Sequence, residues 1–407
     1  MKAAELRRYA DMVVKGCVAL RRGDVILVRL SLGHRELAVA VAEAAYRAGA
    51  AVVDVDYDDP RIYAARILHG SKEALGSREP WREAEVRAFG EEKVGLVQVT
   101  GEFELDVVAK LPPERVAEAT TRQPAGNALA RIRREGRLRG TICAWPTDEW
   151  AARVFPGMDA SRAKRKLAQE LLWFCRLGPG DPPGHKGWTD HLARLRRRAA
   201  RLTKLDLKEV QVVDDGTDLR LRIAPFSMWR GGGETDYWGR RIAMNVPTEE
   251  CFISPDAAAT EGTFRCSRPR SIGGRVIEGI AGEFRGGRLV RLAAKRTADR
   301  DWLARYLAAI PNADRLGEIA LVDATSRIGQ TGRIYYNGLL DENAAAHMAF
   351  GSGFAKTRTV PIGRRRHGVN RSRTHIDVMI GTDALVAHGV TQSGRRVPLV
   401  LDGLWQF

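Results

Sequence analysis

The chain has 407 residues, of which 44% are hydrophobic and 29% charged, and it carries a net charge of +16. This composition is typical of a folded soluble protein, and the absence of an 18-residue apolar run argues against a membrane-spanning helix. The first twenty residues contain no continuous apolar segment, so no secretion signal is expected. The five cysteines are scattered and form no CxxC pair, which favours a reducing cytoplasm and argues against a cysteine-based zinc site.

The excess of positive charge has two interpretations. It could match a polyanionic partner such as RNA, carrier-bound phosphate or an acidic peptide. However, the arginines are dispersed among alanine and glycine, and no RNA-binding or zinc-finger pattern is present. A solvated basic surface is therefore favoured, and nucleic acid remains a possible but not favoured partner.

The first half of the chain has the pattern of an α/β domain. Residues 25–32 predict a buried strand, 35–49 a helix that ends at a glycine, and 51–57 a second strand. This strand–helix–strand order implies a parallel pair of strands. Further strands are predicted at 93–100 and 140–146, and further helices at 113–140, 148–157 and 160–178.

A chain of this length predicts two domains, and the pattern changes near residue 200. A Gly- and Pro-rich loop at 178–187 precedes a basic amphipathic helix at 188–204. We therefore predict an α/β domain over residues 1–200 and a β-rich α+β domain over 201–407. Strand-like segments in the second domain are 209–215, 218–225, 273–295, 317–324, 332–337, 374–381 and 395–407.

Several common catalytic motifs are missing from the sequence. It contains no phosphate-binding P-loop and no GxSxG motif, and the glycines of 230–239 are not followed by a helix. Potential metal ligands, by contrast, occur in four places of the second half, and they are Glu249, Glu250 and Asp256, then Glu318, then Glu342 and His347, then His375 and Asp377.

His375 and Asp377 stand two residues apart in a strand-like segment, so both side chains point to the same face. The segment is otherwise apolar enough to be buried, and burying a charge without a partner is unfavourable. A bound metal ion would remove that cost. A surface ion pair on an edge strand explains the same two residues equally well.

Glu318 raises the same question, because it lies inside the apolar run "GEIALV". In "LDENAAAHMAFGSGF", Asp341 or Asn343 predicts a helix N-cap, which would place His347 on an alanine-rich helix as a core histidine. Each position alone is thus explained without a metal. Together they form a carboxylate-rich set with two histidines, the donor mixture of hydrolases that use two Zn, Co or Mn ions.

The motifs "NVPTEECFISPD", "GEIALV", "YYNGLLDENAAAHMAFG" and "RTHIDVMIG" occur in the same order as in a known family. In these blocks, and in "WPTDEWAARVFPG" and its opening α/β unit, the chain resembles the aminopeptidase T/aminopeptidase S group of dinuclear metallo-aminopeptidases. This resemblance covers nearly the whole chain. It implies a metal-dependent hydrolase that acts as a homodimer and removes N-terminal residues from peptides, or cleaves a related amide.

The resemblance also implies which residues act. The metal ligands fall on Glu250, Glu318, Glu342, His347, His375 and Asp377. Two divalent ions would be bridged by Glu318 and a water, whose ionised form attacks the peptide carbonyl. Either Glu250 or Glu318 would carry the proton, and Glu249 would lie outside the ligand set.

The chain departs from the family pattern at two positions. Phe354 stands where the family has a tyrosine, and Gly338 stands where it usually has a threonine. Loss of one hydroxyl that stabilises a developing oxyanion typically costs about 10²–10³ in rate, and Tyr335 or Tyr336 are candidates to replace it. The alternative function is therefore a repurposed homologue that keeps the metal site but carries out altered tailoring chemistry or binds an anion.

Overall fold

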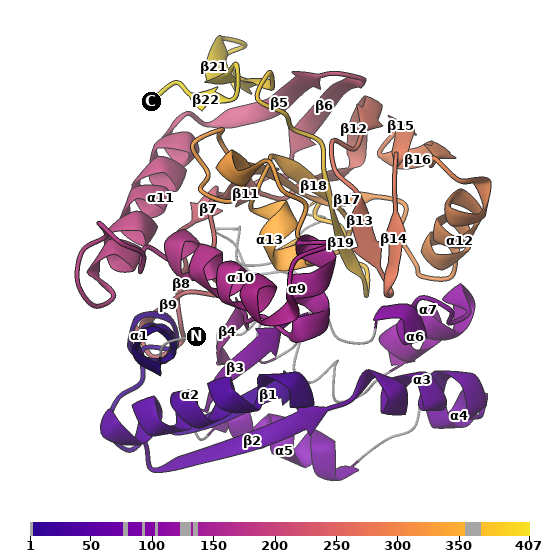
Figure 1. The fold of residues 1–407 in the computed structure, drawn as a ribbon. Helices are drawn as coiled ribbons and strands as arrows, with labels where there is room; N and C mark the ends of the chain where they lie inside the picture. Colours follow the sequence, from indigo (N-terminus) through magenta and orange to yellow (C-terminus); the bar gives the residue numbers. More distant parts are fainter. Residues whose placement is uncertain are drawn as a thin grey trace. The chain divides into compact units, whose positions relative to one another are not determined.

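The computed structural model describes residues 3–75, 80–91, 94–101, 105–122, 132, 137–354 and 368–407. The chain divides into two compact units, each made of three separate segments (Figure 1). Unit 1 comprises Met1–Val108, Arg122–Arg194 and Gly232–Thr248, and unit 2 comprises Ala109–Thr121, Leu195–Gly231 and Glu249–Phe407. The division into domains 1–200 and 201–407 stays a prediction.

Unit 1 is built on a parallel sheet with the strand order β10-β4-β3-β1-β2. Apolar runs form its central strands, and Gly95 of β3 leaves space for the side chain of Ile26 in β1, because a Cβ there would lie 2.6 Å from Ile26 Cδ1. The strands are β1 (Val25–Ser31), β2 (Val52–Asp58), β3 (Gly95–Thr100), β4 (Arg139–Ala144) and β10 (Asn245–Val246), beside the short pair β8 (Glu234–Thr235) and β9 (Arg241–Ile242).

Helices alternate with these strands along the chain. They are α1 (Ala3–Asp11), a π-helix (Met12–Cys17), a 3-10 turn (Leu32–His34), α2 (Arg35–Arg47), α3 (Pro60–His69), α4 (Lys72–Leu75), α5 (Pro80–Glu91), α6 (Leu105–Val108), α9 (Asp148–Val154) and α10 (Ala160–Phe174). Thr147 caps α9 and Asp159 caps α10 through their side-chain oxygens. The predicted parallel pairing is confirmed, and so are the helices predicted at 35–49, 148–157 and 160–178. Of the helix predicted at 113–140, α7 (Pro113–Arg122) is present, and most of the remainder lies outside the described residues.

Unit 2 contains two antiparallel sheets and a hairpin. The larger sheet has the order β16-β15-β12-β6-β5-β20-β21-β22, and the smaller has the order β19-β18-β17-β11-β7. Their strands are β5 (Leu207–Asp214), β6 (Thr217–Ile223), β7 (Arg230–Gly231), β11 (Cys251–Ile253), β12 (Pro255–Arg265), β15 (Ala281–Arg285), β16 (Arg288–Ala293), β17 (Leu316–Leu321), β18 (His347–Gly351), β19 (His375–Met379), β20 (Val386–Thr391), β21 (Arg396–Leu401) and β22 (Leu404–Trp405).

Aromatic side chains join the two sheets of unit 2. Phe264 of β12, Phe284 of β15 and Phe350 of β18 form a triangle with ring centroids 5.6–5.9 Å apart. The remaining elements are the hairpin β13 (Arg270–Ile272) and β14 (Arg275–Ile277), helices α12 (Thr297–Ala308) and α13 (Gly338–Glu342), and a 3-10 turn (Gly329–Thr331), while α11 (Lys186–Lys204) contains the predicted basic helix. The predicted class, α/β followed by β-rich α+β, is confirmed. In the part of the chain that the structure describes, no helix is long and apolar enough to cross a membrane.

The strand predicted at 332–337 is wrong, because this segment forms an irregular loop. The carboxylate of Asp341 accepts hydrogen bonds from the backbone N–H groups of Tyr335 and Asn337, at 2.8 and 3.1 Å. Tyr336, between them, has a left-handed backbone with φ of 54°. The Asp341 side chain thus binds the backbone N–H groups that a strand would donate to a neighbouring strand. The chain therefore turns here instead of extending.

The placement of His347 on a helix is also wrong. Helix α13 ends at Glu342, and its N-cap is Asn337 instead of Asp341 or Asn343. Asn343 then binds the carbonyl of Leu339 through its side chain, and His347 opens strand β18. The backbone after α13 finds its partners in β17 and β19, so sheet pairing overrides the helical preference of the alanines.

Candidate metal centre

The small sheet of unit 2 directs several potential ligands to one face. Register pairs Ala349 of β18 with Glu318 of β17 on one side and with Asp377 of β19 on the other. Residues paired in this way share a face, as do residues two apart on one strand. His347 and His375 therefore join Glu318 and Asp377 on that face.

Glu250 is the residue that precedes β11, and its side chain lies on the same face. Phe252, two residues later, pairs with Ala320, which in turn pairs with His347. The small residues Ala320 and Ala349 thus lie between the potential ligands on this face of the sheet.

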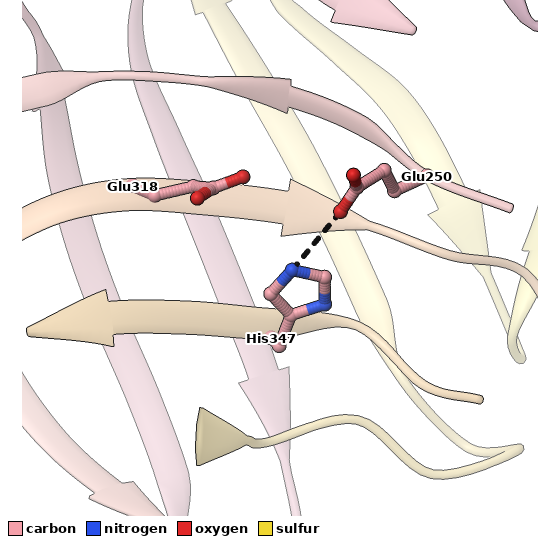
Figure 2. Close-up of side chains that lie close together, drawn as sticks. All are labelled: Glu250, Glu318 and His347. Carbon is pink, nitrogen blue, oxygen red and sulfur yellow. Dashed lines mark ion pairs between the residues drawn. The ribbon is translucent and has the colours of Figure 1, made fainter. Parts of the chain in front are cut away.

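Glu250, Glu318 and His347 form the first potential metal-ligand group (Figure 2). One donor atom from each lies within 4.8 Å of the others, and His347 Nε2 is 3.1 Å from Glu250 Oε2. All three side chains are buried, with exposures of 1% for His347, 9% for Glu250 and 4% for Glu318. We call this set the inner group.

Glu318, His375 and Asp377 form the second potential group under the same 4.8 Å limit. His375 Nε2 lies 3.0 Å from Glu318 Oε2 and 3.1 Å from Asp377 Oδ1. Strand β19 is the edge of its sheet, and the His375 side chain is 28% exposed. We call this set the outer group, and Glu318 belongs to both.

The other acidic candidates occupy different places. Glu342 is buried and near the centre, because the charges of Asp377 and Glu250 both act on it, but it belongs to neither group. Glu249 is also buried, and its backbone N–H donates to Asn343 Oδ1 at 2.8 Å. Asp256 accepts a hydrogen bond from the N–H of Ala258, and Asp341 holds the loop described above.

Burial and mutual repulsion disturb the ionisation of this cluster. Burial raises the pKa of Glu318 to about 7 and that of Glu342 well above its usual range. Burial is the largest single influence on His347 and lowers its pKa, but Glu250, Glu318 and Asp377 together outweigh it, so the pKa rises to about 10. Burial likewise opposes the charged forms of His375 and Asp377, yet their pairing raises the pKa of the histidine and lowers that of the carboxyl.

These donors fit divalent metal ions. Four carboxylates, at Glu250, Glu318, Glu342 and Asp377, lie together in a buried place where they repel one another. In the protein alone, the two histidines hold protons that balance part of this charge. A dication would replace those protons, since imidazole and carboxylate oxygens are the donors that Zn, Co and Mn accept.

Phe354 lies beside the outer group. Its ring centroid is 5.0 Å from that of His375 and 5.1 Å from that of Phe252, and its backbone N–H donates to Ser254 Oγ at 2.9 Å. The position therefore borders the candidate metal centre, but it presents a ring without a hydroxyl. Tyr335 is buried, and its hydroxyl donates to Thr331 Oγ1 at 3.2 Å.

One functional candidate was missed by sequence reasoning. Arg270 of β13 places its Nη2 3.7 Å from Asp377 Oδ2. It sits among many dispersed arginines and outside every quoted motif, so nothing in the sequence distinguished it. Only the packing of the β13–β14 hairpin beside β19 brings it to the ligands (Figure 1).

Comparisons with known proteins cover nearly the whole chain. Residues 2–405 match the family model described as thermophilic metalloprotease (M29). Aminopeptidase T of Thermus thermophilus is 32% identical over 409 residues, covering 98% of each chain, and aminopeptidase 2 of Geobacillus stearothermophilus is 30% identical over 413 residues, covering 99% of this chain and 98% of the relative. The solved structure of wild-type AmpT from Thermus thermophilus superposes with a TM-score of 0.88 at 30% identity, covering 99% of each chain.

Proposed function

Because the chain belongs to the thermophilic metalloprotease (M29) family, we propose that it is a metal-dependent aminopeptidase that hydrolyses the first peptide bond of its substrate. The observation that carries this proposal is the sharing of Glu318 by two ligand groups on one sheet face. Similarity to aminopeptidases over 98% of the chain favours hydrolysis over a repurposed binding or tailoring role.

We infer a centre of two ions, of Zn, Co or Mn, and Glu318 would be a ligand common to both. Glu250 and His347 would hold the inner ion, and His375 and Asp377 the outer one. What bound dications supply in such a site is an ionised water near neutral pH and polarisation of the scissile carbonyl. The buried strands β17 and β18 hold these ligands in place before the substrate arrives.

Proton transfer needs a carboxylate that is not fully engaged by metal. The sequence suggests Glu250 or Glu318, but both belong to the ligand groups. Glu342 lies near Glu250 and Asp377 and outside both groups, so we propose it as the carrier that moves a proton from water to the leaving amine. The sequence-based assignment of Glu342 as a ligand remains the competing prediction.

Hydrolysis of leucyl- and arginyl-arylamides, with metal content measured in the same preparation, tests the proposal. The expected result is turnover that requires Zn²⁺ or Co²⁺, about two ions per chain by elemental analysis, and loss of activity after chelation. The proposal would be contradicted if the protein bound no ion in the presence of excess metal, or if it bound ions but hydrolysed no arylamide. Phe354→Tyr, assayed alongside, shows whether a missing hydroxyl accounts for low activity.

Assembly and location complete the proposal. We propose a homodimer in the cytoplasm, and none of the five cysteines, all of which the structure describes, forms a disulfide, which suits a reducing compartment. Light scattering coupled to size-exclusion chromatography measures the assembly. A monomeric mass at assay concentration would contradict the dimer without affecting the metal centre.

A further inference from the structure

The guanidinium of Arg270 is nearly buried beside the outer group. Its side chain is 12% exposed, and its Nη2 lies 3.7 Å from Asp377 Oδ2, which is too long for a hydrogen bond. Among the described residues, the buried Nε of Arg270 has no hydrogen-bond partner. A buried donor without a partner is costly, so an acceptor bound at this guanidinium would stabilise the site.

Gly338 provides the space that this guanidinium occupies. A Cβ at residue 338 would lie 2.5 Å from Arg270 Nη1 and 2.9 Å from Nη2. Gly338 begins α13, and its φ is not in the left-handed region, so the backbone conformation gives no reason for glycine there. The absence of a side chain at this position is what admits Arg270 to the face of the metal centre.

Asp377 forms no hydrogen bond with the guanidinium, because its nearer oxygen, Oδ2, stays 3.7 Å from Arg270 Nη2, while its Oδ1 lies 3.1 Å from His375 Nε2. A planar guanidinium pairs best with the two oxygens of a carboxylate, so the missing acceptor is an anion with carboxylate geometry.

We propose that Arg270 is an anion-binding residue of the catalytic site, which holds the carbonyl oxygen as it becomes negative and then the carboxylate of the released amino acid. This inference rests on the proposed aminopeptidase function. Water adds to the carbonyl carbon and the C–N bond breaks. Both protons of the water end on the leaving amine, and the new carboxylate keeps the negative charge. Arg270 would thereby supply a donor to the developing oxyanion, which the ring of Phe354 cannot do.

Product binding tests this role without relying on turnover. Isothermal titration of the zinc-loaded protein compares L-leucine with leucinol, which has the same amine and side chain but no carboxylate. Arg270→Gln should weaken leucine binding by about 10- to 100-fold and change leucinol binding by less than about twofold. Arg270→Lys should recover part of the leucine affinity, because it restores the charge but not the planar fork.

Gly338→Ala provides an independent variant that leaves the arginine in the sequence. Its methyl group displaces only the flexible end of Arg270, so the fold is kept while the discrimination between leucine and leucinol falls. Arg220→Gln is the matched control. It removes an exposed arginine from β6, in the other sheet of the same unit, and should change neither affinity.

Two results would overturn the inference, namely equal weakening of leucine and leucinol by Arg270→Gln, or loss of zinc from that variant by elemental analysis. The second result would mean that Arg270 acts on Asp377 instead of on the ligand. Failure of the proposed function has a different signature, because the wild-type protein would then hydrolyse no arylamide. Leucine binding that still depends on Arg270 in such a protein would support the anion site on its own.

Discussion

The inner and outer ligand groups share Glu318 but lie in different surroundings. The inner group is sealed, since the His347 side chain is 1% exposed on a central strand. The outer group lies on the edge strand, with His375 28% exposed and bordered by Phe354 and Arg270. Buried ligands favour permanent retention of an ion, whereas an open edge favours exchange and access for substrate. We therefore expect the inner ion to be structural as well as catalytic, and the outer one to receive the substrate.

Removing the shared ligand should have the largest effect. Glu318→Gln keeps the shape of the side chain but takes a charge from both groups, so both ions should bind poorly and kcat/KM should fall by more than about 10⁴-fold. Elemental analysis and arylamide hydrolysis measure the two effects. Full occupancy by two ions in this variant would show that Glu318 does not join the groups.

Glu342→Gln separates a proton carrier from a ligand. If Glu342 carries the proton, the variant keeps its metal while kcat falls by about 10²–10⁴-fold and KM changes little. Metal content measured on the same sample decides the matter. Loss of an ion would restore the assignment of Glu342 as a ligand, which the resemblance implied.

The contrast in exposure predicts two phases of metal release. A chelator should remove the outer ion first, and His375→Gln should abolish this fast phase by weakening that ion by at least about a hundredfold. His347→Gln should instead affect the slow phase. Stopped-flow absorbance with a zinc indicator resolves the phases, and a single phase in the wild type would contradict the distinction between the groups.

The metal-free protein should lose stability as the pH rises. Its His347 has a pKa of about 10, above the ordinary 6.5, so the proton stabilises the folded state below pH 6.5 and this contribution is lost between 6.5 and 10. The raised pKa of Glu318 acts with the same sign up to about 7. Thermal unfolding of chelated protein should therefore show a Tm that falls across this window, and His347→Gln should flatten the slope. The pKa of Asp377 is lowered, so its opposite contribution lies at acid pH.

Phe354→Tyr should have the smallest effect. With Arg270 in place, the added hydroxyl repeats an existing donor, so kcat should rise by less than about tenfold. In an Arg270→Gln background the same change should give a larger gain. Steady-state kinetics of the four proteins form a double-mutant cycle, and equal gains in both backgrounds would show that the two side chains act independently.

Local patterns in the sequence determined much of the fold. Apolar runs and helix ends identified the parallel sheet of unit 1, and alternating residues identified most strands of unit 2. They failed where side chains replaced backbone partners. Asp341 accepts hydrogen bonds from the N–H groups of Tyr335 and Asn337. The alanines before His347 form no helix and lead instead into β18. Neither these side-chain hydrogen bonds nor the pairing of β18 with distant strands leaves a periodic trace in the sequence.

For the site, the sequence by itself supplied the donors, because the chemistry of carboxylates and histidines is a local property and "THIDVMIG" already places two of them on one face. It could not supply their partners. The register that sets Ala349 between Glu318 and Asp377, the position of Glu342 outside both groups, and the entry of Arg270 above Gly338 depend on contacts between segments distant in the chain. Only the tertiary structure decides such contacts, because they are fixed by strand pairing and by the space that neighbouring side chains leave.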